Sequence, residues 1–307
     1  MMMNIEYKQD RIGPARRFFS IAMLFGLWFA PLPAIARDGA RPDRIEQPEK
    51  IGVGTWPLHG EARMIRDIDR LGARWFYSWT KRAPQSDRRF VPMHWGRQDS
   101  AGQTHAVMLA FNEPDEPKQA AMTVEEALAQ WPRLMAAARR LSSPATSREQ
   151  TLGAQSWLGR FMAEAERRSY RVDFIAVHYY TQDPDIGLFK RFLEQVHAQY
   201  GRPVWVTEWA LADWDRPDRF SAAQQQAFFE GAVQMMDDLD FVERHAWFGT
   251  YAGLDNLDLG SALLTRDGRL TPLGDAFRAA AQGSLKGPEC VSEPKDAASG
   301  SVSPAPC

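Results

Sequence analysis

Short apolar runs alternate along the chain with longer segments of helical character. Eight runs rich in β-branched and aromatic residues predict strands, at residues 51–56, 75–79, 90–95, 105–112, 141–146, 172–180, 203–209 and 243–251. Helical segments follow most of them, at residues 61–71, 123–139, 154–168, 186–199, 221–239 and 272–282. Because connections of helix length return the chain in the same direction, the strands are predicted to be parallel.

This alternation predicts an α/β fold, a (β/α)8 TIM barrel over residues 51–282, which is near the usual size of about 250 residues. The intervals 80–89 and 96–104 are too short for full helices, so we expect abbreviated helices after strands 2 and 3. Thr123-x-x-Glu126 and Ser221-x-x-Gln224 have the pattern of capping boxes that begin helices. An open doubly wound sheet is the alternative, although no glycine-rich dinucleotide fingerprint follows the first strand.

The two ends of the chain do not have the composition of a folded domain. Residues 1–36 have the pattern of a signal peptide: basic residues precede the apolar run 18–30, and small residues end at Ala36. We expect cleavage after Ala36, export to the periplasm or the medium, and no stable membrane insertion afterwards; an uncleaved membrane anchor is the alternative. Residues 37–50 are predicted to be a linker and residues 283–307 a disordered C-terminal tail.

Composition narrows the classes of partner. Loss of residues 1–36 would remove four basic and two acidic residues and change the formal net charge from −2 to −4. That balance argues against nucleic acid, which needs a basic footprint. Both cysteines, Cys290 and Cys307, lie in the tail and could pair or stay free. No Cys/His cluster has metal-ligand spacing, so we expect no metal or cofactor, and we expect a monomer.

Two of the predicted strands end in a glutamate. Glu113 closes the run at 105–112, and Glu208 closes the run at 203–209. The C-terminal tips of barrel strands meet at one mouth, and two carboxylates in one pocket are the minimum needed to cleave a glycosidic bond. Strand alternation places Val204, Val206 and Glu208 on one face, so we expect the valines to fill the barrel interior below Glu208. The alternatives are a Glu208 that merely pairs with a basic residue and a Glu113 that belongs to an ordinary turn.

Other side chains at the strand tips suit a sugar-binding groove. His178 and Tyr180 share a strand face with Ala176 and should point toward the mouth. Asn112, just before Glu113, can hydrogen-bond a sugar hydroxyl beside the reacting carbon. Aromatic or imidazole residues recur at the C-terminal ends of strands or soon after them, although each alone also suits core packing. The candidates for binding substrate are Tyr77, Trp79, His94, Trp95, Trp157, Trp209 and Trp247.

Eight segments in this order resemble glycoside hydrolase family 128. They are Tyr77-Ser78-Trp79, Pro92-Met93-His94-Trp95-Gly96, Phe111-Asn112-Glu113-Pro114-Asp115, Ser143-Pro144-Ala145, Trp157-Leu158, Asp173-Phe174-Ile175-Ala176-Val177-His178, Val206-Thr207-Glu208-Trp209 and Ala246-Trp247-Phe248. The resemblance covers residues 51–282. Two departures are His94, where leucine would be expected, and the charged segment 81–89.

The resemblance implies a retaining (β/α)8 glycosidase that cleaves β-1,3-glucan internally, with a polysaccharide or oligosaccharide as substrate. It implies Glu113 as general acid/base, Glu208 as nucleophile and Asn112 at the 2-hydroxyl. It also implies His178 or Tyr180 beside the nucleophile and Trp247 as the platform under the reacting sugar. The alternatives are a glycan-binding barrel with little turnover, a component of exopolysaccharide assembly, and a glycosidase for another β-glucan linkage.

Overall fold

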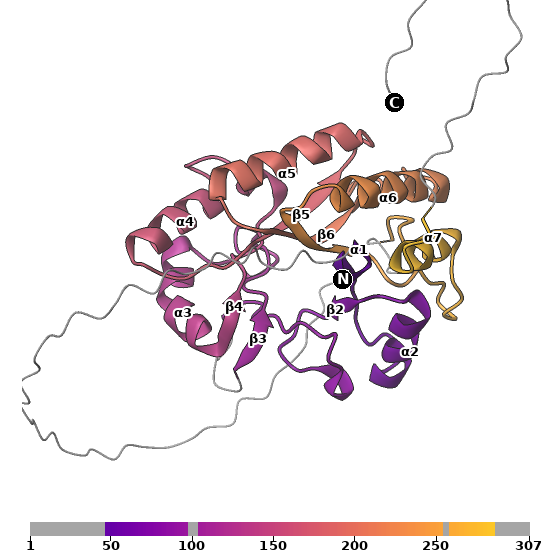
Figure 1. Ribbon diagram of the computed structural model, residues 1–307, viewed down its shortest axis with the longest axis horizontal. Coiled ribbons are helices and arrows are strands. Elements are labelled where there is room, and N and C mark those ends of the chain that lie inside the picture. Colours follow the sequence, from indigo (N-terminus) through magenta and orange to yellow (C-terminus); the bar gives the residue numbers. More distant parts are fainter. Residues whose placement is uncertain (1–46, 98–103, 254–257, 286–307) are drawn as a thin grey trace, which may run out of the picture. The chain divides into compact units, whose positions relative to one another are not determined.

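The computed structural model describes residues 47–97, 104–253 and 258–285 (Figure 1). The predicted signal peptide, most of the predicted linker and nearly all of the predicted tail, with Cys290 and Cys307, lie outside the described residues. Among the described residues, no helix is both long and apolar enough to cross a bilayer.

In the described residues, seven strands form the centre of the fold. Five pair in the order β2-β1-β7-β6-β5, and β3 pairs with β4; every pairing is parallel. The strands are β1 (Ile51–Gly54), β2 (Trp75–Tyr77), β3 (His105–Met108), β4 (Ala138–Leu141), β5 (Ile175–Thr181), β6 (Val204–Leu211) and β7 (Val242–Trp247).

Isolated parallel bridges close these two sheets into a ring. Phe90 bridges to Phe76 and Met93 bridges to Leu109, so the segment predicted as the third strand lies between β2 and β3. It forms no continuous ladder, because Pro92 has no N–H to donate. Ser142 bridges to Phe174 and thereby joins β4 to β5. The predicted barrel is therefore confirmed, with one of its eight positions held by isolated bridges.

All six predicted helices are present, and they lie around the strands in Figure 1. They are α2 (Glu61–Leu71), α3 (Val124–Ala137), α4 (Trp157–Arg167), α5 (Ile186–Tyr200), α6 (Ala222–Asp237) and α7 (Pro272–Ala281). Both capping boxes are formed, at Thr123 and at Ser221. Between β2 and the bridging segment there is only a 3-10 turn, η1 (Pro84–Ser86), as the short interval predicted. A second 3-10 turn, η2 (Arg148–Gln150), follows β4.

The boundary predicted for the N-terminal linker is wrong by four residues. Gln47–Lys50 forms a single helical turn, α1, that runs directly into β1. The Lys50 side chain is buried, and its Nζ donates to the carbonyls of Met236, Asp237 and Leu239. A cation that satisfies the last carbonyls of a helix stabilises that helix end. These residues therefore belong to the folded body.

The barrel interior is filled by aromatic and aliphatic side chains that come only from strands and their flanking bridges. They are Trp75, Tyr77, Val91, Met93, Leu109, Phe174, Trp205 and Ala246. A separate, larger cluster contains the helix residues and packs them against the outer face of the strands. Val204 and Val206 belong to that outer cluster, so the prediction that they fill the interior is wrong.

The reason is an irregularity in β6. Val206 pairs with Val177 on β5, but the next pair is Glu208 with His178, so Thr207 is the extra residue of a bulge. A bulge reverses the alternation of side chains beyond it. Trp205 therefore fills the interior, Val206 faces the helices, and Glu208 again points inward at the mouth.

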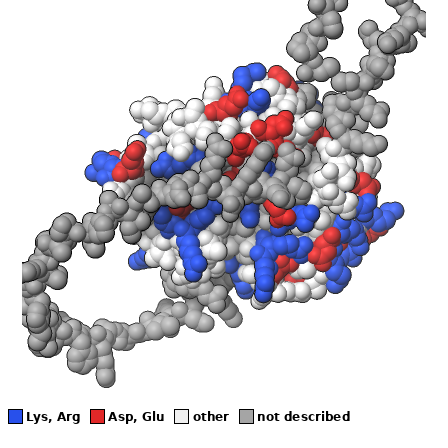
Figure 2. All heavy atoms as spheres, in the orientation of Figure 1, with Lys and Arg blue, Asp and Glu red and all other residues white. Residues whose placement is uncertain are grey.

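Basic side chains gather over α2 and the segment after β2 (Figure 2). Many of them pair with acids nearby: Arg63 with Asp67, Arg89 with Asp69 and Asp87, and Arg82 with Glu61. Exposed pairs, such as that of Arg82 with Glu61, contribute only about 0–1 kcal/mol each, whereas Asp67 is itself fully buried. These ion pairs nevertheless neutralise much of the local charge.

Candidate active site

Glu113 projects from the loop that follows β3. Its backbone N–H donates to the Ala145 carbonyl at 2.6 Å, and Asn112 bridges to Ala145, so the strand exit is tied to the neighbouring strand. The φ angle of Glu113 is 41°, in the left-handed region. That conformation costs a non-glycine residue roughly 1–2 kcal/mol. Such residues concentrate at active sites, where the surrounding structure holds them.

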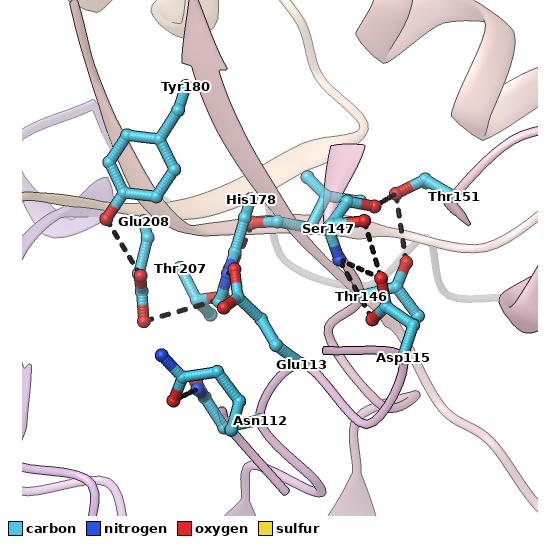
Figure 3. Close-up of polar contacts among 12 residues, drawn as sticks. Asn112, Glu113, Asp115, Thr146, Ser147, Thr151, His178, Tyr180, Thr207 and Glu208 are labelled. Carbon is cyan, nitrogen blue, oxygen red and sulfur yellow. Dashed lines mark hydrogen bonds and ion pairs between the residues drawn. The ribbon is translucent and has the colours of Figure 1, made fainter. Parts of the chain in front are cut away.

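Glu208 is buried and surrounded by hydrogen-bond donors. Its Oε1 accepts from Trp79 Nε1 at 2.9 Å and from the Tyr77 hydroxyl at 3.2 Å. Its Oε2 accepts from the Tyr180 hydroxyl at 2.8 Å (Figure 3). No arginine forms an ion pair with either glutamate in the described part of the chain. The alternative of a Glu208 that merely pairs with a basic residue is therefore wrong, because its hydrogen-bond donors are Tyr77, Trp79 and Tyr180.

His178 lies between the two carboxyl groups. Its Nδ1 is 2.9 Å from Glu113 Oε1 and its Nε2 is 3.5 Å from Glu208 Oε1 (Figure 3). One oxygen from each glutamate and a ring nitrogen of His178 all lie within 4.8 Å of one another. The strand tips of β3, β5 and β6 thus bring together the three groups that the sequence predicted to share one mouth.

The electrostatics of the three groups are linked. Burial raises the pKa of Glu208 and the charge of Glu113 raises it further, whereas His178 and the bonds from Trp79 and Tyr180 partly offset this rise. Burial alone would lower the pKa of His178, but the charges of Glu208 and Glu113 outweigh it and leave the pKa raised. The site can therefore retain a proton close to two carboxylates.

The same three side chains have the ligand types of a divalent-cation site. Glu208, however, already accepts bonds from Trp79, Tyr77 and Tyr180. These donors stabilise the carboxylate anion in place and leave it little remaining capacity to bind a metal. The arrangement therefore suits covalent and acid–base chemistry better than metal binding.

Aromatic side chains surround Glu208 at the mouth. Trp79 and Tyr180 are half-buried and contact it directly. The Phe248 ring lies edge-on to both, at 6.2 Å from Trp79 and 5.8 Å from Tyr180. Trp56 lies 6.1 Å from Trp79, and Trp214, which is 50% exposed, lies 5.1 Å from Tyr180. Together these rings give the mouth apolar walls of the kind that flat sugar faces favour.

Three predicted sugar contacts are wrong, because the structure buries them elsewhere. Trp247 is fully buried; its ring lies edge-on to Trp209 at 4.6 Å, and its indole donates to the Ser261 carbonyl. Trp209 is also fully buried in the layer between strands and helices. Trp157 donates to the Met122 carbonyl from within the same layer. All three stabilise the helical jacket and do not face the mouth.

The remaining predicted residues lie near the site without contacting both carboxylates. His94 is buried with its ring edge-on to Phe111 at 5.5 Å. Trp95 is half-buried and packs against the barrel interior. Asn112 is buried, its Nδ2 reaches Gln119 at 3.4 Å, and its Oδ1 has no hydrogen-bond partner among the described residues.

Comparison with known proteins agrees with this geometry. Residues 57–277 match the family described as glycosyl hydrolase catalytic core. A crystal structure from Amycolatopsis mediterranei, a subgroup I endo-β-1,3-glucanase of glycoside hydrolase family 128 bound to laminaripentaose, is 36% identical. The match covers 76% of this chain and 99% of that one, with a TM-score of 0.66. The chain belongs to glycoside hydrolase family 128.

Further relatives extend the family assignment. A subgroup II endo-β-1,3-glucanase of the same family from Sorangium cellulosum is 26% identical over 75% of this chain and 98% of that one, with a TM-score of 0.59. The alkali-sensitive linkage protein 1 of Schizosaccharomyces pombe is 27% identical over 226 residues, which are 67% of this chain and 40% of the yeast protein. The chain thus spans less than half the length of that curated relative. The enzyme is a glycoside hydrolase.

Sequence reasoning missed two members of the aromatic mouth, Trp56 and Phe248. Trp56 ends the first predicted strand and Phe248 lies in the last one, so both follow the recurrence of aromatic residues at strand tips. That pattern was sufficient to select Trp56. For Phe248, the resemblance drew attention to Trp247, the last residue of β7, whose ring packs away from the mouth against Trp209.

Proposed function

We propose that the enzyme hydrolyses β-1,3-glucan with retention of anomeric configuration, by a double displacement on Glu208. The observation that carries this proposal is the meeting of Glu113, His178 and Glu208 within 4.8 Å at one aromatic mouth. Retaining glycosidases hold their carboxyl groups about 5–5.5 Å apart, whereas inverting ones need about 6.5–9.5 Å to admit a water. The laminaripentaose bound by the Amycolatopsis relative supports a β-1,3-glucan substrate.

In the first step, an oxygen of ionised Glu208 forms a bond to the anomeric carbon. The bond from that carbon to the leaving oxygen breaks, and Glu113 gives its proton to that oxygen. Trp79, Tyr77 and Tyr180 hold the Glu208 carboxylate in place through their hydrogen bonds. His178 orients Glu113 through Nδ1.

In the second step, Glu113 accepts a proton from water while the water oxygen attacks the anomeric carbon. The bond to Glu208 breaks, the sugar leaves with its original configuration, and Glu113 is protonated again. Asn112 lies beside Glu113 in the chain and, with an unpartnered buried Oδ1, can accept from a sugar hydroxyl at the reacting ring. The chemistry requires no metal ion or organic cofactor.

The test uses laminarin and the variants Glu208→Gln and Glu113→Gln, with Glu116→Gln as a matched control. Glu116 is exposed on the same loop as Glu113. We expect release of reducing ends to fall to background in Glu208→Gln, to fall sharply in Glu113→Gln and to stay normal in Glu116→Gln. Proton NMR of the first product should show the β-anomer.

Near-normal turnover by Glu208→Gln would exclude the nucleophile assignment. Tight binding of laminarin without turnover by the natural sequence would favour a glycan-binding barrel. Preferential cleavage of β-1,4- or mixed-linked glucan would change the proposed substrate but leave the proposed mechanism in place. The lengths of the products would distinguish internal from terminal cleavage.

We also propose that the enzyme is exported after loss of residues 1–36 and acts as a monomer. The basic and apolar pattern of those residues supports export. Mass spectrometry of the mature N-terminus and sedimentation of the purified enzyme test the two statements. An intact segment 18–30 would contradict cleavage.

A further inference from the structure

Asp115 makes an ordered connection beside the site that the proposed mechanism does not use. The backbone N–H of Ser147 lies 3.1 Å from Asp115 Oδ1 and 3.2 Å from Oδ2, and the Ser147 hydroxyl donates to Oδ2 at 2.5 Å (Figure 3). The Asp115 carboxylate thus accepts hydrogen bonds from both the main chain and the side chain of Ser147. We name this pair the Asp115–Ser147 clamp.

The Ser147 side of the clamp is itself fixed. Its carbonyl accepts from the Thr151 hydroxyl at 3.0 Å, which also lies 3.1 Å from the Thr146 hydroxyl. Both threonines are fully buried. The hydroxyl of Tyr200, at the end of α5, donates to the Thr151 carbonyl at 2.5 Å. Ser147 is therefore a rigid point of attachment and not a mobile loop tip.

Glu113 lies between two attachments of its own segment. On one side its N–H bonds to the Ala145 carbonyl, and on the other side Asp115 bonds to Ser147. Only Pro114 separates Glu113 from Asp115. The left-handed φ of Glu113 is costly for a residue with a side chain, whereas hydrogen bonds to a charged acceptor are among the stronger ones. The clamp is therefore strong enough to hold Glu113 in a conformation that it would otherwise leave.

We propose that Asp115 is a positioning residue that holds the Glu113 carboxyl at the leaving oxygen of the substrate. The inference rests on the proposed role of Glu113 as acid/base. Without the clamp, the segment relaxes and the Glu113 carboxyl moves away from His178 and from the bond to be cleaved. A displacement of about 1 Å costs on the order of 100-fold in rate.

This role has a signature that a purely structural one lacks. Proton donation matters when the leaving group is a sugar alcohol, and it matters little when the leaving group is an acidic phenol that departs without a proton. Loss of the clamp should therefore lower kcat/KM for glucan much more than kcat/KM for an aryl glycoside. General destabilisation would lower both equally, because it removes folded enzyme.

The experiment compares laminarin with 2,4-dinitrophenyl β-laminaribioside for Asp115→Asn, Ser147→Ala and Glu113→Ala. Asp173→Asn is the matched control, because Asp173 Oδ2 also accepts from a backbone N–H across neighbouring strands, that of Leu141 at 2.7 Å. It precedes β5 and lies at the opposite end of the barrel from the mouth. Thermal denaturation of each variant records the folded fraction.

For Asp115→Asn we expect kcat/KM on laminarin to fall by about 10- to 100-fold and kcat/KM on the dinitrophenyl substrate to fall by less than about 3-fold. Ser147→Ala keeps the backbone donor to Asp115. It should also lose more kcat/KM on laminarin than on the dinitrophenyl substrate, but the loss should be smaller. This variant tests the proposal even if Asp115→Asn does not fold. Asp173→Asn should change both substrates equally.

Equal losses on both substrates in Asp115→Asn and Ser147→Ala, or no loss on laminarin, would overturn the positioning role. Glu113→Ala decides the underlying function separately. If Glu113→Ala cleaves laminarin normally, the proposed mechanism itself fails. If Glu113→Ala is defective while the clamp variants are not, only the clamp proposal fails.

Discussion

The hydrogen bond from Tyr180 to Glu208 should set the acid limit of activity. Glu208 must be ionised to attack, and burial raises its pKa above the usual 4.5. The Tyr180 hydroxyl, 2.8 Å from Oε2, is one of the groups that lower this pKa. In Tyr180→Phe the carboxylate loses that donor while the ring, with its contacts to Trp214 and Phe248, remains.

The expected magnitude follows from the charge on the acceptor. A hydrogen bond to an ionised group contributes about 1.5–3 kcal/mol, and about 1.36 kcal/mol corresponds to one pKa unit. The bond favours the charged form, so its loss raises the pKa of Glu208. The acidic limb of kcat/KM against pH should therefore move upward by roughly 1–2 pH units.

The measurement is the pH profile of laminarin hydrolysis for the natural sequence, Tyr180→Phe and Tyr179→Phe. Tyr179 is the preceding residue of β5 but faces outward, stacked on Phe189 at 3.9 Å. Its variant should leave the acidic limb in place. An acidic limb that stays fixed or moves to lower pH in Tyr180→Phe would refute the idea that the hydroxyl stabilises an ionised Glu208.

Further variants should distinguish residues that bind substrate from residues that stabilise the fold. Trp247→Ala should lower the free energy of unfolding by about 3–5 kcal/mol, because a fully buried indole is lost. Phe248→Ala should mainly raise KM for laminarin. If this placement were wrong, thermal melts and steady-state kinetics would show the same loss of stability and the same rise in KM for both variants. Asp237 is half-buried, and desolvation of its carboxyl raises the pKa from 3.8 to about 6. The stability that it contributes is therefore fully present below about pH 3.8 and is lost as pH rises through about 6. Asp237→Asn should therefore raise Tm at pH 8 and change it little at pH 4, and a fall in Tm at pH 8 would contradict this reasoning.

Local signals in the sequence were sufficient for the helices and for the meeting of the acids. The capping box at Ser221 predicts a helix that begins at Ala222, because the bonds that stop its fraying lie within four residues. Glu113, His178 and Glu208 could be placed together because parallel barrel strands all present their C-terminal tips to one mouth.

What could not be predicted depends on register between strands that are distant in the sequence. The bulge at Thr207 exists only relative to β5, so simple alternation assigned Val204 and Val206 to the wrong face. The segment 90–95 has a strand-like composition, yet Pro92 interrupts its ladder with both neighbours. For Trp247, no pattern within β7 reveals which face meets α6. That depends on packing against Phe229 at 5.4 Å.

The indole of Trp79 gives the enzyme a built-in optical reporter. Its N–H donates to Oε1 of Glu208, whose carboxylate must be ionised to attack the sugar. Esterification of Glu208 would remove the charge of the carboxylate and alter the emission of one identifiable chromophore among the tryptophans of the enzyme. Stopped-flow fluorescence of the natural sequence would then follow the formation and decay of the covalent intermediate without any label, and loss of the signal in Trp79→Phe would assign it to this indole.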